Sequence, residues 1–150
     1  MKPLFVLLGT FLVSLVIVKL TGGRYDPAFA GRIAMSVMLL FTAVSHFVLT
    51  KGMVMMIPTF FPFKKFLIYL TGIIEVMAAA GLHIPALQKL TAWMLILFFV
   101  LILPANINAA IKKVDFQKAT HEGNGTTYLW FRIPLQILFI IWTYFCAILL

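Results

Sequence analysis

Residues 66–82 read FLIYLTGIIEVMAAAGL, an apolar stretch that is long enough to cross a membrane and has one carboxylate, Glu75, in its middle. An acidic side chain at the centre of a membrane helix costs about 2.5–3.5 kcal/mol on insertion scales. We therefore expect Glu75 to be paired, protonated or turned toward a cavity. Ionisable residues inside a membrane are candidates for a functional site, so Glu75 indicates where such a site lies without identifying its ligand.

The composition predicts an integral membrane protein. The chain has 150 residues, of which 63% are hydrophobic and 11% are charged, and a soluble domain of this size cannot bury so much apolar surface. The net charge of +8 comes from Lys and Arg that lie mostly in loops and at segment ends, a pattern typical of membrane topology rather than of nucleic-acid binding. The single cysteine, Cys146, excludes an intramolecular disulfide, a Cys-x-x-Cys redox pair and a cysteine-ligated cluster.

Five apolar runs of 18–22 residues match a hydrocarbon core of about 30 Å. Because separate crossings without β alternation must be helices, we expect an all-α transmembrane bundle that forms one domain over residues 1–150. The first run resembles a signal peptide but lacks an Ala-x-Ala-like cleavage site, so we interpret it as a retained helix. The predicted helices are 3–20, 32–50, 65–82, 90–111 and 129–150.

The distribution of Lys and Arg predicts the orientation of this bundle. With five crossings, eight basic residues lie on the side of the amino terminus and four lie on the other side. The positive-inside rule then places the amino terminus and the 51–64 and 112–128 connections in the cytoplasm, and the carboxyl terminus outside.

The connection at 51–64 is apolar and aromatic but too short to cross the membrane. Pro58 and Pro62 prevent it from forming a continuous helix. One interpretation, which we favour, is an interfacial segment anchored by Phe60, Phe61 and Phe63. The other interpretation is a flexible, methionine-rich lip over a ligand entrance.

Polar side chains from four of the predicted helices gather in the cytoplasmic half, whereas the outer half is nearly featureless. At 1.5 Å per residue they lie about 5–15 Å from the cytoplasmic helix ends, with Glu75 deepest. The helix face around Glu75 carries small residues, which mark packing faces in membranes: Thr71, Gly72, Ala78 and Ala79. We expect a polar pocket with these members: His46, Glu75, Asn106, Arg132 and Gln136.

Two neighbours of Asn106 affect this expectation. Pro104 removes a backbone donor and frees a carbonyl one turn earlier. Inside a membrane this carbonyl must be satisfied by a side chain, a neighbouring helix or water. A bend at this position therefore fits a polar cavity. Asn108 points roughly away from Asn106 and is the weaker candidate.

Each pocket residue also has a purely structural interpretation. Glu75 and Arg132 could form an ion pair that locks two helices, or Arg132 could extend to lipid headgroups. His46 could be a packing histidine. Asn106 and Gln136 could be interhelical hydrogen-bond partners.

Four motifs in this order resemble the DoxX-like family of small bacterial membrane proteins, over about residues 32–150: Ser45-His46-Phe47, Tyr69-Leu-Thr-Gly72-Ile-Ile-Glu75, Pro104-Ala105-Asn106-Ile107 and Trp130-Phe-Arg132-Ile-Pro134-Leu-Gln136. The resemblance implies a four-helix bundle in the bacterial inner membrane, to which the helix at 3–20 is an addition. Some members are linked to quinone-dependent sulfur oxidation or to membrane redox complexes.

Three functions remain open. The first is a redox-linked accessory subunit that binds a quinone or a similar apolar ligand in the polar pocket, where Glu75 could pass protons. Its electrons would come from a partner subunit, because the sequence carries no haem, flavin or metal signature. The second is a structural or assembly subunit of a larger membrane complex. The third is a proton-coupled transporter of a small molecule or lipid, although no inverted repeat is visible. Membrane lipids and other membrane subunits are the expected partners, and we assign neither an enzyme class nor an oligomeric state.

Overall fold

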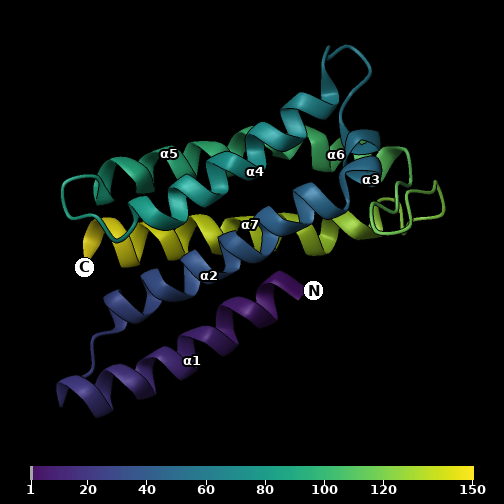
Figure 1. Ribbon diagram of the computed structural model, residues 1–150. Coiled ribbons are helices and arrows are strands. Elements are labelled where there is room, and N and C mark those ends of the chain that lie inside the picture. Colours follow the sequence, from purple (N-terminus) through teal and green to yellow (C-terminus); the bar gives the residue numbers. More distant parts are fainter. Residues whose placement is uncertain (1) are drawn as a thin grey trace.

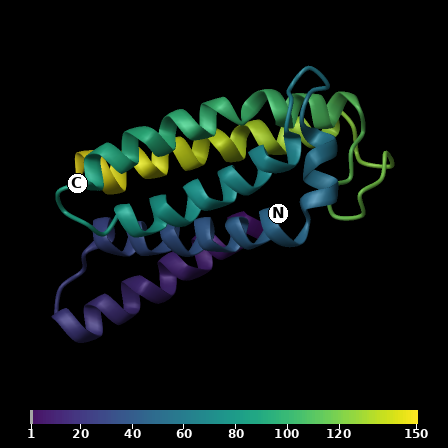
Figure 2. The same cartoon turned by 45° about the horizontal axis from the view of Figure 1, so that its top comes forward.

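The computed structural model describes residues 2–150, and every regular element in this range is a helix (Figure 1). The long helices lie side by side, with the carboxyl terminus at one end of the bundle (Figure 2). We call the opposite end, which carries α3 and the loop after α6, the α3 end. The elements are α1 (Lys2–Gly22), α2 (Pro27–Val48), α3 (Thr50–Met56), α4 (Lys64–Gly81), α5 (Gln88–Leu101), α6 (Leu103–Ile111), α7 (Thr127–Tyr144) and the π-helical turn η1 (Phe145–Leu149).

Four helical stretches are long and apolar enough to cross a membrane, judged by length and composition: Lys2–Gly22, Pro27–Val48, Gln88–Ile111 and Thr127–Leu149. The predicted segment 65–82 forms α4, which has 18 residues. It carries Lys64, Lys65 and Glu75, more acidic and basic residues than any of the four. Length and composition therefore single out four of the five predicted crossings.

Two helix boundaries differ from the prediction for local chemical reasons. The second helix begins at Pro27 rather than near residue 32, because Asp26 caps it: the Phe29 N–H donates to Asp26 Oδ1 at 2.9 Å, and proline fits the first turn. The predicted helix 90–111 is interrupted at Ile102 and forms α5 and α6. Pro104 lies in the first turn of α6, where its missing N–H is tolerated.

Helix α2 lies in the middle of the packing and α1 lies at the edge of the bundle, beside α2, in both views (Figures 1 and 2). Met35, Met38 and Leu39 of α2 are almost completely buried in the core. From α1, Leu7 is fully buried and the Phe11 ring meets the Trp142 ring edge-on, with centroids 4.9 Å apart. Most other α1 side chains are exposed, so α1 is attached to the bundle by a narrow apolar stripe.

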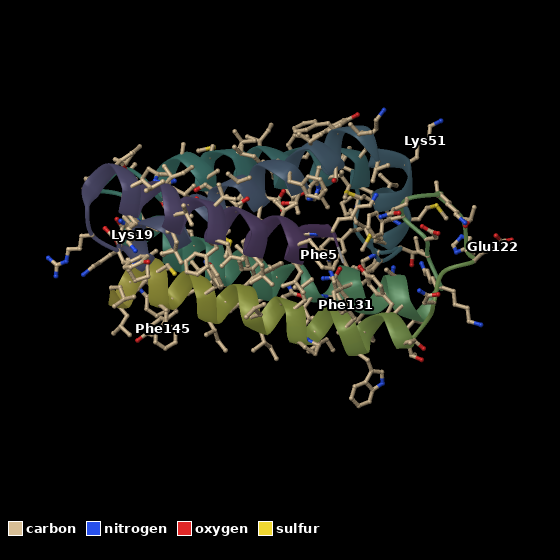
Figure 3. The ribbon with its side chains drawn as sticks, turned by 90° about the horizontal axis from the view of Figure 1, so that it is seen from below. Phe5, Lys19, Lys51, Glu122, Phe131 and Phe145 are labelled. Atoms are coloured by element: carbon tan, nitrogen blue, oxygen red, sulfur yellow. The ribbon has the colours of Figure 1, made fainter. Side chains whose placement is uncertain are left out.

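Close contacts with glycine position the elements around the α3 end. A Cβ on Gly72 of α4 would lie 3.0 Å from the Cβ of His46, so glycine allows α4 to approach α2 closely. A Cβ on Gly52 of α3 would overlap with the Phe116 carbonyl, so glycine also allows the loop after α6 to lie against α3. Figure 3 shows charged side chains at both ends of the bundle: Lys51 and Glu122 lie at the α3 end, and Lys19 lies at the other end.

Candidate ligand-binding site

A cavity of about 470 Å³ lies near the α3 end, and all five predicted pocket residues line it. The helices that contribute are α2, α4, α6 and α7, as the sequence predicts, and α3 and α5 add apolar side chains. Exposed residues such as Phe41, Phe61 and Leu101 also line the cavity, so it reaches the surface of the bundle. The volume lies within the range of about 300–1,000 Å³ that small-molecule sites occupy.

The rotation of α4 places Glu75 inside the bundle. Glu75 is 5% exposed, and Gly72 and Ala79 on the same face are also buried. Ile73 and Met77, which point away from this face, are 49% and 67% exposed. The predicted small-residue face of this helix is therefore confirmed.

The ionisable side chain that contacts Glu75 is His46 rather than Arg132. His46 Nε2 lies 3.5 Å from Glu75 Oε2, the single contact between an acidic and a basic side chain within residues 2–150, and it is an ion pair only when His46 is protonated. The Glu75–Arg132 pair that the sequence left open is not formed. Instead, the Arg132 guanidinium lies over the ring of Tyr128, one turn earlier on the same helix, at 5.9 Å from its centroid.

The His46 ring is held from its other side by Thr71. Thr71 Oγ1 lies 3.0 Å from His46 Nδ1, and the same hydroxyl donates to the carbonyl of Ile68 at 2.8 Å. Thr71 and Glu75 are one turn apart on α4, so both can reach a single ring on α2. The result is a contiguous hydroxyl–imidazole–carboxylate row on the cavity wall.

Asn106 and Gln136 form a separate, buried pair. Asn106 Nδ2 donates to Gln136 Oε1 at 3.2 Å, and Gln136 Nε2 donates to the carbonyl of Phe99. Phe99 lies about one turn before Pro104, next to the interruption between α5 and α6. The carbonyl that Pro104 deprives of its helical donor is that of Val100, one residue later, so the Phe99 bond joins α7 to this region without testing the predicted partner of the freed carbonyl.

The 51–64 connection forms part of the cavity rim. Met53, Met56 and Phe61 line the cavity, whereas Phe60 and Phe63 are strongly exposed, so the segment has both a lip face and an outward aromatic face. Asn108, which the sequence places away from Asn106, donates from Nδ2 to the carbonyl of Met56 at 2.6 Å. It therefore fastens α3 to α6.

The predicted pocket lacks two residues of this site: Lys2, which no pattern in the sequence indicates, and Thr71, which helical spacing places on the Glu75 face but not among the pocket residues. Lys2 lines the cavity from α1, which the resemblance treats only as an addition. The spacing of residues within one helix cannot reveal that Lys2 lines the cavity, because this contact depends on how α1 packs against α2. Thr71 could have been found, since it precedes Glu75 by one helical turn.

The expectation of a nearly featureless outer half is wrong. Polar side chains form hydrogen bonds between elements there. Arg32 Nη1 donates to the carbonyl of Cys146 at 3.0 Å, and Gln88 Nε2 donates to the carbonyl of Ala147 at 3.1 Å. Both carbonyls lie in η1, whose π-helical turn changes the hydrogen-bond register. Ser36 Oγ donates to the carbonyl of Ala79 and lies 3.0 Å from His83 Nε2.

Within residues 2–150, no group of three or more His, Cys, Asp or Glu side chains is placed so that it could hold a metal ion. The polar groups of the cavity are instead an imidazole, a guanidinium, an ammonium, three carboxamides and three hydroxyls, next to one carboxylate. This set suits hydrogen bonding to an organic ligand.

Comparison with known proteins gives one match. A family model described as a domain of unknown function, DUF8561, matches residues 35–147. The match begins inside α2, leaves α1 outside and contains all five predicted pocket residues. No curated protein and no solved structure matches the chain. The chain belongs to the DUF8561 family.

Proposed function

We propose that this protein is a multi-pass membrane protein that binds a quinone, or a similar apolar molecule with a polar head, in the cavity near the α3 end. One observation carries the proposal: polar side chains from separate helices converge on one otherwise apolar cavity of about 470 Å³. Apolar walls with a few convergent polar groups are characteristic of small-molecule sites.

The chemistry of the walls fits a quinone head. Its two carbonyl oxygens need hydrogen-bond donors, which Arg132 and Lys2 supply. Its ring needs flat apolar surfaces, which Phe98, Phe99 and other aromatic lining residues offer. Glu75 and His46 together form a site that can hold a proton next to the ligand.

We further propose that α4 is a fifth crossing. Its 18 residues span about 27 Å, close to the thickness of a hydrocarbon core. Lys64 and Lys65 lie in its first turn, where they can reach the headgroups, and Glu75 faces the cavity rather than lipid. The excess of basic residues supports a cytoplasmic α3 end and amino terminus and an external carboxyl terminus. The DoxX-like resemblance supports a bacterial inner membrane.

In this proposal the protein is an accessory subunit of a redox system. Electrons reach the ligand from a partner subunit, while this chain binds the head and supplies protons. The largely exposed surface of α1 is available to lipid or to such a partner.

The structural alternative rests on the Asn106–Gln136 pair. These amides are hydrogen-bonded to each other and to Phe99, so they join α6, α7 and α5 without needing a ligand. If the remaining cavity residues act in the same way, the protein is an assembly subunit with no ligand of its own.

Extraction of the purified protein distinguishes the two functions. The protein is isolated in mild detergent, and its bound small molecules and lipids are quantified by mass spectrometry. The wild type is compared with Ala105→Phe, which fills the cavity, and with Ala80→Phe, which adds the same bulk at an exposed position on α4. Thermal unfolding of each variant reports whether the helices remain packed.

Near-stoichiometric quinone in the wild type and in Ala80→Phe, with loss in a folded Ala105→Phe, supports the proposed function. Co-purifying subunits without any organic ligand, unchanged by Ala105→Phe, would support the structural alternative. In the first case, Arg132→Gln is expected to lower the quinone content, since it removes a donor from the cavity wall.

A further inference from the structure

We infer that His46 and Glu75 share a single titrating proton, and that an apolar ligand entering the cavity draws one proton into this pair. The inference rests on the proposed ligand-binding function and adds a pH dependence to it. It is carried by the two contacts of the His46 ring and by the environment of the Glu75 carboxylate.

The contact with Thr71 determines which nitrogen of His46 always carries hydrogen. The carbonyl of Ile68 can only accept, so the Thr71 hydroxyl hydrogen points to it at 2.8 Å. The Thr71 oxygen must then accept from the His46 nitrogen that lies 3.0 Å away, which is Nδ1. Neutral His46 therefore carries its hydrogen on Nδ1 and presents the bare lone pair of Nε2 to Glu75.

The carboxylate that faces this lone pair has no other support. Glu75 is 5% exposed, and its Oε2 is buried without a hydrogen-bond donor within residues 2–150. Oε2 lies 3.5 Å from Nε2, so two acceptors face each other when both groups are deprotonated. One proton removes this conflict, either as imidazolium with carboxylate or as imidazole with carboxylic acid.

The other charged groups on the cavity favour loss of that proton while the cavity holds water. Lys2 of α1 and Arg132 of α7 are cationic, and the lining residues of α3, α5, α6 and the loop after α6 carry no charge. Lys2 is exposed and Arg132 is half-buried, so both keep water when a ligand binds, whereas Glu75 does not.

A ligand that displaces the cavity water therefore shifts the balance at the pair. An unprotonated carboxylate in an apolar, waterless site is costly, and here Oε2 would face another acceptor, His46 Nε2, at 3.5 Å. Taking up one proton converts the pair into a hydrogen-bonded unit with no net charge. Affinity should then fall by up to about tenfold for each unit of pH above the range in which the free pair loses its proton.

Isothermal titration calorimetry with decylubiquinone measures this coupling. Titrations in two buffers with different ionisation enthalpies, at pH 6 to 9, give the number of protons taken up for each quinone bound. The wild type is expected to take up between half and one proton on the alkaline side. Glu122→Gln, which removes an exposed loop carboxylate, is the matched control and should behave like the wild type.

Glu75→Gln is expected to bind decylubiquinone without proton uptake and with an affinity that does not change with pH. On the alkaline side it should bind more tightly than the wild type, because the glutamine amide has no charge to neutralise. Glu75→Asp retains a carboxylate and should retain uptake, which covers the case in which the glutamine variant does not fold. Quinone binding by the wild type without proton uptake would overturn the inference and leave the proposed function intact. Absence of quinone binding would overturn the proposed function and the coupling together.

Nitrogen-15 NMR of His46 in the ligand-free protein tests the first step separately. Nδ1 should remain protonated at alkaline pH, and Thr71→Val should release this preference while Thr71→Ser keeps it. A neutral His46 with its hydrogen on Nε2 would contradict the inference whatever the ligand is.

Discussion

The side-chain amide of Gln136 donates a hydrogen bond to the backbone carbonyl of Phe99, next to the interruption between α5 and α6. This bond joins α7 to the helix that Pro104 interrupts. In an apolar bundle a carbonyl at such an interruption needs a donor from elsewhere in the protein. Gln136 is 7% exposed and also accepts from Asn106, so it connects two helical segments through one amide.

The Gln136 amide should therefore contribute measurably to stability. Gln136→Leu is expected to lower the free energy of unfolding by about 1–2 kcal/mol, because the Phe99 carbonyl and the Asn106 amide both lose a partner. A double-mutant cycle with Asn106→Ala should give a coupling energy of about 0.5–2 kcal/mol. Reversible unfolding in mixed micelles provides both values. Full additivity would contradict the observed pair, and Gln117→Leu in the exposed loop is the control.

Gly72 should tolerate little added volume, because a Cβ there would lie 3.0 Å from the Cβ of His46 and 3.1 Å from the Phe47 ring. Gly72→Leu is expected to destabilise the bundle by about 1–3 kcal/mol through overpacking between α2 and α4. Thermal unfolding in detergent measures this cost. Ile73→Leu, at a 49% exposed position one residue later, should change little. Equal effects of the two substitutions would mean that α4 does not pack on α2 through Gly72.

The lip formed by α3 should open more often without Asn108. Its bond to the Met56 carbonyl, at 2.6 Å, ties α3 to α6. Asn108→Ala is expected to raise the rate at which a cysteine at position 53 reacts with a thiol reagent. The increase should be roughly two- to tenfold, which corresponds to the net free energy of one hydrogen bond. The measurement uses Met53→Cys in a Cys146→Ser background. Asn124→Ala in the exposed loop should leave the rate unchanged, and an unchanged rate in Asn108→Ala would show that the bond does not restrain the lip.

Acidification should destabilise the end of the bundle opposite α3 through His83. Burial lowers the pKa of His83 and the nearby Arg32 charge lowers it further, so the folded protein favours the neutral ring. Its folded-state pKa lies below its unfolded value, and His83 therefore contributes stability that is present above the unfolded pKa and is lost as pH falls through the folded pKa. Thermal unfolding between pH 7.5 and 5 should show a smaller loss in His83→Gln than in the wild type, whereas His121→Gln in the loop should match the wild type. An identical pH dependence in His83→Gln would exclude this role.

The periodicity of single helices accounts for much of the candidate site. Glu75 and its small neighbours lie on one face because positions three and four residues apart share a face on any α-helix, and this held in the bundle. The same reasoning identified five residues that do line one cavity. It left open an ion pair between Glu75 and Arg132 that is not formed, because spacing along α4 and α7 does not determine how far each helix is rotated toward α2.

Composition and a rise of 1.5 Å per residue are enough to predict the apolar helices, the proline that interrupts one of them and the depth of each polar residue along its helix. Three contacts could be seen only in the folded bundle: His46 faces Glu75, Lys2 reaches the cavity from α1, and Asn108 holds the α3 lip. Those relationships depend on the rotation and register between helices, which are set by many small packing contacts, such as the one at Gly72, and by no single motif.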